Sequence, residues 1–514
     1  MTTLRFAAFG QDDSRLAGPE IGRVYVATRE GDLCCPGLVG DDQGLPIDGD
    51  HLACPPGEGF LLNVRWAMPG FGYLWLQADN GGQFYRVPRV GNAQVWNLNY
   101  ELARTRVLWN STLDAAAETP SAAASAPPQR VADAVAEAGA MLHDAMFANH
   151  DRRSRLADEA LARALDGGER LAVHLARSRL RRQHAAGHVR RLRLANPVRR
   201  EHLDDASAAA LWQAAFDEAT VTFTSEMLTS GNFAASEALV DRALALGVAV
   251  RGRSLLSCVD EHGQLRAAQS HEELACWRDQ AVALARRFAG RVTTWELVPA
   301  APHMALGEGH LAQIVDTANA VHAACPEVEL VLSPGELFAP RMSPPAASGQ
   351  AQLALGPIQV FRRCLAQAPC ISAFGLPLYW PNCDLLQLAR MIDLAASAGR
   401  PVHLLAAAAP SLWQDDPQAD LCRGDAGFTR GLGFWRHPWS PEVQAEYVLG
   451  LATIARAHPA VSALEWLDFS DAAPHVFPYA GLLDAAGEAK PLHRELVAAR
   501  ESDFDLDRPW AGDL

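Results

Sequence analysis

The segment from residue 191 to residue 469 alternates short β-forming runs with helical patterns eight times. The strand candidates are residues 191–196, 219–223, 248–256, 292–298, 328–333, 370–378, 401–407 and 461–469. Apolar residues at helical spacing fill the intervals, for example at 234–246, 271–289 and 441–458. Parallel strands require crossover helices, so eight such units predict a closed (β/α)8 TIM barrel over residues 186–500, with a C-terminal tail at 501–514.

The first 185 residues have a different organisation. Residues 1–110 alternate β-type runs, such as 23–27, 60–66 and 73–77, with turns rich in Gly, Pro, Asp and Asn, which predicts a β-sandwich without helices. An Ala/Ser/Pro linker follows at 111–130, and amphipathic helices form a connector at 131–185. The predicted fold class is α/β: a TIM barrel preceded by an all-β domain and a helical connector.

Composition and charge exclude several classes of function. The chain has 514 residues, 49% of them hydrophobic, a formal net charge of −15 and a pI near 5.6, which opposes binding to nucleic-acid phosphates. No apolar run approaches the roughly 20 residues that cross a bilayer, so we expect no membrane partner. The N-terminus lacks the apolar core of a secretory signal, which predicts a cytoplasmic location.

The ten cysteines are scattered, with no C-x-x-C pair and no Cys/His cluster at zinc spacing. We therefore expect reduced thiols, no metal site and no cofactor. Cys34 and Cys35 are neighbours, and adjacent cysteines make poor structural disulfides.

Four segments of the predicted barrel carry motifs at the spacing of barrel strands. They read VTFTSEM at 221–227, ALGVAVRGRSLL at 245–256, RVTTWELVPA at 291–300, and a closing segment at 444–491 that ends in GLLDAAGEAKP. Together they resemble glycoside hydrolase family 10, the endo-β-1,4-xylanases. The resemblance covers residues 190–496 and implies a glycan-cleaving barrel whose site lies at the C-terminal ends of the strands.

The positions that would carry catalysis in this family are altered. The resemblance places the catalytic acid at Ala300 and the nucleophile near Ala406, in a run of alanines that ends the seventh strand. Retaining hydrolysis needs two carboxyl groups about 5–5.5 Å apart. We therefore predict that the chain is degenerate as a xylanase.

Carboxylates elsewhere near strand ends leave a relocated active site open. The candidates are Glu336 at the exit of the fifth strand, Glu226 after the second and Asp471 after the eighth. Glu296 and Glu465 lie inside strands, and we expect structural roles for both, either in the layers of the barrel interior or towards the helices.

The seventh β/α loop, residues 410–440, is long and rich in aromatic residues, which indicates an ordered and functional loop. Its tryptophans either stack against sugar rings or pack as a lid over the barrel mouth, and the sequence leaves both alternatives open. The predicted ligand-binding residues are Arg253, Tyr379, Trp380, Trp413, Trp435, Trp439 and His475.

The predicted function is binding of a glycan or another small polar ligand at the barrel mouth. Two alternatives stay open: a glycosidase with relocated carboxylates, and a non-catalytic structural or assembly scaffold. An acidic mouth with two carboxylates about 5–10 Å apart would favour the enzyme, and a closed apolar mouth would favour the scaffold. The resemblance also implies that the β domain is similar to a carbohydrate-binding module. No oligomeric state is predicted.

Overall fold

The structure, a computed structural model, describes residues 3–10, 12, 14–16, 24–31, 33–35, 41, 44–48, 59–87, 94–117, 127–188, 190–256, 266, 268–299, 306–337, 355–379, 382–412, 434–472, 475, 477, 479–501 and 510. The chain divides into two compact units. The N-terminal unit comprises Met1–Ala185 and Asn382–Arg390, and the barrel unit comprises Ala186–Pro381 and Met391–Trp510.

The eight predicted strands form a closed parallel barrel, which confirms the predicted TIM barrel. Every strand boundary lies within three residues of its prediction. The last strand pairs with the first, Glu465 lying opposite Ala195, and this pairing closes the sheet. In barrel order the strands are β8 (Arg193–Pro197), β9 (Glu218–Thr222), β10 (Ala249–Arg253), β11 (Thr294–Glu296), β12 (Glu329–Leu332), β13 (Ile371–Tyr379), β14 (Val402–Ala407) and β17 (Val461–Trp466).

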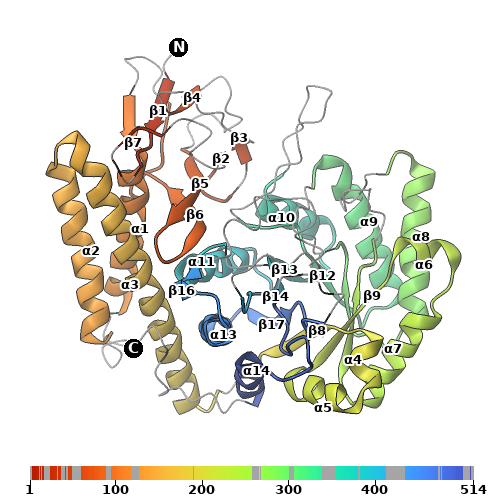
Figure 1. The fold of residues 1–514 in the computed structure, drawn as a ribbon. Helices are drawn as coiled ribbons and strands as arrows, with labels where there is room; N and C mark the ends of the chain where they lie inside the picture. The colour runs from red at the N-terminus through yellow and green to blue at the C-terminus, as the bar shows by residue number, and fades with distance from the viewer. Residues whose placement is uncertain are drawn as a thin grey trace. The chain divides into compact units, whose positions relative to one another are not determined.

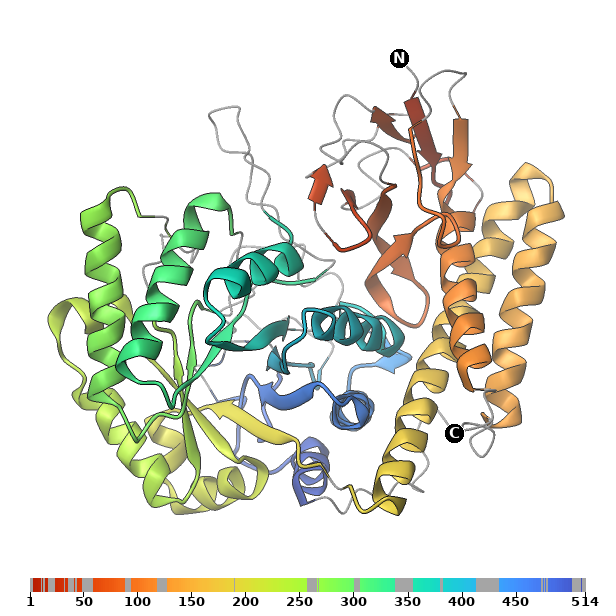
Figure 2. The same ribbon diagram turned by 180° about the vertical axis from the view of Figure 1, so that it is seen from behind.

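Helices follow the strands and cover the outside of the barrel, as Figures 1 and 2 show for α7, α8 and α9. Serine N-caps fix where two of them begin: Ser270 Oγ accepts from Glu273 N at 3.1 Å, and Ser440 Oγ accepts from Val443 N at 3.3 Å. The helices of this unit are α4 (Arg200–Asp204), α5 (Ala206–Ala215), α6 (Ser225–Ser230), α7 (Ala234–Ala245), α8 (His271–Arg287), α9 (Glu308–Ala324), α10 (Pro357–Gln367), α13 (Pro441–Ala457) and α14 (Pro491–Glu501), while α11 (Leu385–Ala396) belongs partly to each unit. A short hairpin, β15 (Phe434–Trp435) and β16 (His437–Pro438), precedes α13.

Outward-facing aromatic rings join the barrel strands to the helices. The Trp295 ring lies 5.1 Å from the Phe223 ring and 6.4 Å from the Phe288 ring. Trp295 stands opposite Gly252 on the neighbouring strand, and a Cβ at Gly252 would come within 2.2 Å of the indole. Glycine is needed at this position because the ring of the neighbouring strand occupies the space of a side chain.

Two small sheets form the β part of the N-terminal unit, in agreement with the predicted β domain. Both contribute to an aromatic core around Tyr85, whose ring centre lies 4.8 Å from Phe6, 5.5 Å from Trp96 and 5.9 Å from Phe60. One sheet has the order β4 (Leu45–Asp48), β1 (Thr3–Ala7), β7 (Gln94–Asn97), and the other the order β3 (Leu33–Cys35), β2 (Val24–Ala27), β5 (Leu61–Met68), β6 (Gly72–Ala78).

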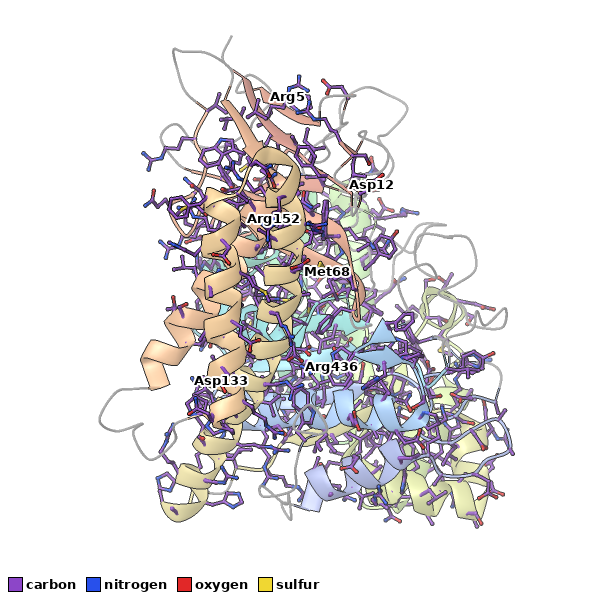
Figure 3. The ribbon with its side chains drawn as sticks, turned by 60° about the vertical axis from the view of Figure 1, so that its left-hand side comes forward. Arg5, Asp12, Met68, Asp133, Arg152 and Arg436 are labelled. Atoms are coloured by element: carbon purple, nitrogen blue, oxygen red, sulfur yellow. The ribbon has the colours of Figure 1, made fainter. Side chains whose placement is uncertain are left out.

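Three helices complete the N-terminal unit: α1 (Leu98–Ala117), α2 (Gln129–Phe147) and α3 (His150–Ala185). Their apolar faces meet at Val107, Ala138 and Ala164, one from each helix. Figure 3 shows α2 and α3 with Asp133 and Arg152 labelled on them. The expectation that residues 1–110 lack a helix is corrected, because α1 begins at Leu98 and runs past residue 110.

Helix α1 escaped prediction because polar side chains alternate with apolar ones on its buried face. The Asn110 amide donates to the Ala164 carbonyl at 2.8 Å, and Glu101 accepts from the Tyr85 hydroxyl at 2.6 Å. Thr105 donates to Asp79 at 2.9 Å. A helix whose buried face mixes hydrogen-bonded polar residues with apolar ones leaves only a weak hydrophobic period in the sequence.

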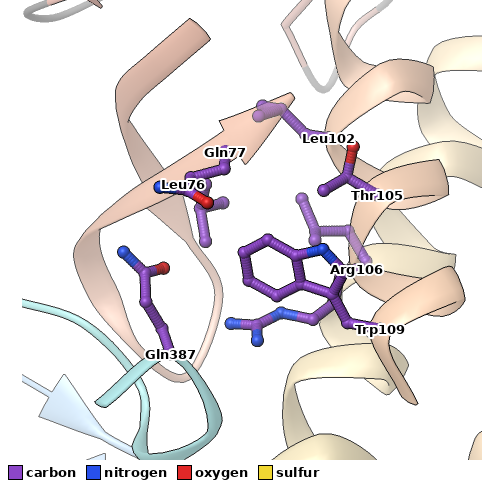
Figure 4. Close-up of a pocket in the computed structure, with 8 residues that line it drawn as sticks. Leu76, Gln77, Leu102, Thr105, Arg106, Trp109 and Gln387 are labelled. Carbon is purple, nitrogen blue, oxygen red and sulfur yellow. The ribbon is translucent and has the colours of Figure 1, made fainter. Parts of the chain in front are cut away.

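The segment 382–390 is held within the N-terminal unit by polar contacts. Trp75 N donates to the Asn382 carbonyl at 2.8 Å, Leu385 N donates to Glu169 at 3.0 Å, and the buried Arg106 pairs with Asp384. Beside them lies a cavity of about 10 Å³, drawn in Figure 4. Its volume corresponds to about one water molecule, so this cavity is too small for an organic ligand.

One cysteine differs from the sequence expectation. Cys34 takes part in a disulfide bond, so the prediction of ten reduced thiols is wrong at this position. Sequence spacing alone does not reveal which cysteines come within bonding distance in the folded chain. Cys276, Cys325, Cys364, Cys370 and Cys383 are free thiols.

Among the helices that the structure describes, none is long and apolar enough to cross a membrane.

Candidate functional site

The top of the barrel interior is organised around Arg253, the last residue of β10. Its Nε donates to Glu296 Oε2 at 2.8 Å, and its Nη2 donates to Glu296 Oε1 at 3.0 Å and also to Glu465. Glu296 ends the neighbouring strand β11, and Glu465 lies on β17 across the barrel. Both carboxylates therefore point into the barrel interior, one of the two orientations that the sequence left open.

Further contacts fix the second carboxylate. Glu465 Oε2 accepts from the Thr220 hydroxyl at 2.7 Å, and its Oε1 accepts from the backbone N–H of Ala406 at 3.2 Å. The side chains of Glu296 and Glu465 are 0% and 1% exposed, against 14% for Arg253. The triad of Arg253, Glu296 and Glu465 is thus a buried ion cluster in which both acids are already hydrogen-bonded.

A second ionic layer lies beneath this triad. Arg251 donates to Glu218 at 3.0 Å, and Arg193 donates to Glu218 at 2.8 Å and to Glu329 at 3.3 Å. Counting both layers, three arginines (Arg193, Arg251 and Arg253) face four glutamates (Glu218, Glu296, Glu329 and Glu465).

The excess of carboxylates separates the pKa values of the two upper glutamates. Burial raises the pKa of Glu296 above its usual value, although Arg253 opposes the shift. Burial acts on Glu465 too, but Arg253 and Arg251 hold the pKa of this carboxyl below its usual range. Of the two, Glu296 takes up a proton first, and a proton there leaves three negative charges facing the three arginines.

His403 of β14 completes the lower layer as a neutral ring. Burial lowers its pKa, and the neighbouring Arg251 lowers it further. Arg251 Nη2 lies 3.1 Å from Nδ1, and Glu329 Oε1 lies 3.4 Å from Nε2. Arg193 Nη2 also lies 3.1 Å from Nε2, so each ring nitrogen faces a guanidinium, which only donates hydrogen bonds, and Nε2 faces Glu329 as well.

Apolar side chains cover the triad on the β13–β14 side. Tyr379 and Ala406 are both buried, and both have left-handed backbone angles, with φ of 53° and 52°. Such angles in residues other than glycine are uncommon and require support from their surroundings. The cluster consists of Tyr379, Ala406, Ala408, Leu467, Phe477 and Ala480.

The three relocated acid candidates have different environments. Glu336 is buried beyond the end of β12, and Glu226 lies exposed in the first turn of α6. Asp471 pairs with Lys490, and its Oδ1 accepts from Gly481 N at 2.7 Å. Burial raises the pKa of Asp471 and lowers that of Lys490, the signature of an ion pair that has been withdrawn from water.

The aromatic residues predicted to bind ligand divide into two groups. Trp380 and Trp413 lie outside the described residues, as does Ala300, the position that the resemblance gives to the catalytic acid. Trp435 and Trp439 are buried, and their rings stack 6.3 Å apart at an interplanar angle of 14°.

Neighbours on three sides enclose Trp435. Its ring lies 5.3 Å from Tyr447 of α13 and 5.8 Å from Trp510, and the Arg436 guanidinium, labelled in Figure 3, lies 5.6 Å from its centre. The described end of this loop therefore favours packing over sugar stacking.

His475 is buried near Asp471, whose pKa its charge would lower. Among the described residues no group of three or more His, Cys, Asp or Glu could hold a metal ion.

The cluster of arginines and glutamates in the barrel was not predicted from the sequence, although one signal for it was present. Arg251 and Arg253 are two residues apart on one strand, so their side chains face the same side of the sheet. Glu296 ends the next strand.

His202 on α4 predicts a measurable pH dependence. Burial, with Phe469 5.1 Å from the imidazole, lowers the pKa of His202 to about 4. Unfolding frees a histidine with a pKa of about 6.5, so between pH 7 and pH 5 the unfolded chain binds a proton that the folded chain does not. Stability should fall over this interval by about 2 kcal/mol from His202 alone.

Urea unfolding of the His202→Gln variant at pH 7 and pH 5 should show a correspondingly smaller loss than the parent chain. His271→Gln, at an exposed position on α8, is the matched control and should keep the full loss. Equal losses in the parent and His202→Gln would contradict the assignment.

No protein-family model and no curated protein sequence matches the chain. Solved structures similar to it include a xylanase of glycoside hydrolase family 10 from Thermobacillus composti, with 18% identity and a TM-score of 0.41 over 62% of this chain and 99% of that one. Xylanase 10B from Thermotoga maritima has 15% identity and a TM-score of 0.42 over 62% of this chain and 96% of that one. A psychrophilic endo-β-1,4-xylanase of the same family has 16% identity and a TM-score of 0.43 over 63% of this chain and 99% of that one. At these values the likeness carries no conclusion about activity. The family is the one that the sequence motifs resemble.

Proposed function

We propose that this protein is a non-hydrolytic barrel that binds a glycan or another small polar ligand at its mouth. The observation that carries the proposal is the Arg253 guanidinium, which holds both Glu296 and Glu465. A general acid must reach the leaving-group oxygen, and a nucleophile must reach the sugar carbon. Two carboxylates that are at most 1% exposed and share one arginine do neither.

Polar atoms near the end of β12 support a binding role. Ser333 directly follows β12, and its buried Oγ has no hydrogen-bond partner among the described residues. A buried hydroxyl without a partner costs about 1–3 kcal/mol, and a ligand hydroxyl would recover this energy if the mouth opened around Ser333, which is 1% exposed. Arg253, with 14% of its side chain exposed, is partly accessible at the top of the barrel.

The first test is hydrolysis. The purified chain should release no reducing ends from xylan and no aglycone from aryl β-xylosides, because acid assistance alone is worth about 10²–10⁴-fold in rate. An active xylanase assayed in parallel sets the detection limit. Turnover that is lost in Glu336→Gln or Glu226→Gln would contradict the proposal and establish relocated carboxylates.

The second test is binding. A ligand present at 100 times its dissociation constant adds about 2.7 kcal/mol to stability, so an oligosaccharide panel should include members that raise the melting temperature. Ser333→Ala, which removes only one buried hydroxyl, should weaken that response. A panel that shifts nothing favours the scaffold, the candidate supported by the apolar cluster of Tyr379, Phe477 and their neighbours.

The disulfide at Cys34 bears on the compartment. Structural disulfides persist in oxidising environments and are rare in the cytosol. The bond therefore favours an oxidising compartment over the cytoplasm that the sequence predicted.

A further inference from the structure

The β part of the N-terminal unit has a surface groove, separate from the barrel mouth. The groove has a volume of about 350 Å³, within the range of small-molecule sites. It lies where β1, β7 and the turn after β6 meet. Its lining residues are Leu4, Asn80, Gln83, Phe84, Tyr85, Arg86 and Trp96.

Hydrogen bonds hold the turn that forms one wall. Asp79 accepts from Gly82 N at 2.9 Å through its side chain and from Phe84 N at 2.8 Å through its carbonyl. Arg104 donates to the Asn80 side chain at 3.0 Å. Asn80 and Phe84 both have left-handed backbone angles, with φ of 57° and 60°. A turn fixed in this way presents its side chains without having to be ordered by the ligand.

The opposite wall is aromatic. Tyr85 is buried, and its hydroxyl donates to Glu101 at 2.6 Å, which fixes the ring against Trp96. Trp96 is partly buried and lines the groove. Its Nε1 is buried and has no hydrogen-bond partner among the described residues. An indole N–H in this state is stabilised by any acceptor that comes within reach.

The combination of these walls identifies the class of ligand. An indole and a phenyl ring provide flat apolar faces, while Asn80 and Gln83 provide planar amides that both donate and accept hydrogen bonds. A sugar ring has the matching pattern, with apolar C–H faces and hydroxyls around its rim. We propose that this groove binds a saccharide, independently of the barrel mouth.

Other ligand classes fit the groove less well. A nucleic-acid strand needs several cations along its backbone, but among the described residues that line the groove Arg86 is the one basic residue, on a chain with a net charge of −15. None of these described lining residues is acidic, so they offer a cationic peptide no counter-charge. The single arginine leaves room for both a neutral sugar and a uronic acid.

The experiment titrates the full-length chain calorimetrically with xylohexaose, cellohexaose and trigalacturonic acid. At least one of them should bind. Trp96→Ala should weaken its binding by at least tenfold, since stacking and the indole donor are lost together. Gln83→Ala, at an exposed position that does not affect folding, should weaken binding several-fold. Tyr73→Ala, an exposed aromatic in the same unit but outside the groove, should leave binding unchanged.

Two results would overturn the groove site. One is the absence of binding by all three probes. The other is binding that Ser333→Ala weakens and that Trp96→Ala and Gln83→Ala leave unchanged, which would place the ligand at the barrel mouth instead. Conversely, binding lost in the groove variants and retained in Ser333→Ala supports the groove and counts against the mouth. Arg86→Gln distinguishes the sugars: it should weaken trigalacturonic acid selectively if a uronate carboxylate is recognised.

Discussion

Replacement of Arg253 by methionine is expected to lower the free energy of unfolding by about 3–5 kcal/mol at pH 7. The substitution keeps the length of the side chain but leaves Glu296 and Glu465 buried without their shared cation, and an uncompensated buried charge is strongly destabilising. Urea unfolding measured by circular dichroism gives the difference directly. Arg200→Met is the matched control, because Arg200 pairs with Asp204 at the surface and such pairs are worth less than about 1 kcal/mol.

The stability of Arg253→Met should also depend on pH differently from that of the parent chain. Without Arg253 the folded-state pKa values of Glu296 and Glu465 should both rise above those of the unfolded chain, so the folded state binds more protons. Stability of the variant relative to the parent should therefore recover as the pH falls from 7 towards 5. Glu296→Gln in the Arg253→Met background should recover part of the loss at pH 7. A loss below about 1 kcal/mol, with no pH dependence, would mean that the cluster is not ionised.

Replacement of Trp435 by alanine is expected to destabilise the free protein by about 3–5 kcal/mol, the usual cost of deleting a buried tryptophan. Trp435 is 2% exposed and contacts Trp439, Tyr447 and Trp510. Phe434→Ala is a close control, because its side chain is the next one along the chain and 47% exposed. It should change stability by less than about 0.5 kcal/mol.

A glycan panel separates the two roles of Trp435. If the ring only packs against its neighbours, the melting-temperature shift that a ligand produces in the parent should persist in Trp435→Ala. The melting temperature of the ligand-free variant should be lower than that of the parent. A variant that keeps its stability and loses the shift would contradict the packing assignment and restore the sugar-stacking alternative.

Much of the barrel could be predicted from the sequence because its signals are local. Strand β14 is an apolar run interrupted only by His403, and α8 shows helical spacing after a serine cap, so each element is specified by residues within about one helical turn or one strand. Helix α1 is the exception, since Glu101, Thr105 and Asn110 are buried through hydrogen bonds and interrupt the hydrophobic pattern.

The candidate site was predicted only in part. The sequence placed Arg253 at the mouth, and it assigned Glu296 and Glu465 to structural roles. It did not indicate that these three residues meet, because Glu465 is 212 residues from Arg253 and reaches it only when β17 pairs with β8. The groove on the β domain was not predicted either, since Leu4 and Trp96 come together through the parallel pairing of β1 with β7, and Gln83 comes from the separate turn after β6.

The sequence by itself determined the order, type and length of the barrel elements, because period, caps and turns act over a few residues. The resemblance also assigns the xylanase-like acid position to Ala300, and this assignment stays a prediction from the sequence. Only the tertiary structure decided that Glu296 and Glu465 share Arg253, that Trp435 and Trp439 face aromatic neighbours, and that Cys34 forms a disulfide. These outcomes depend on which strands become neighbours when the sheet closes, and closure brings together side chains whose separation along the chain carries no periodic signal.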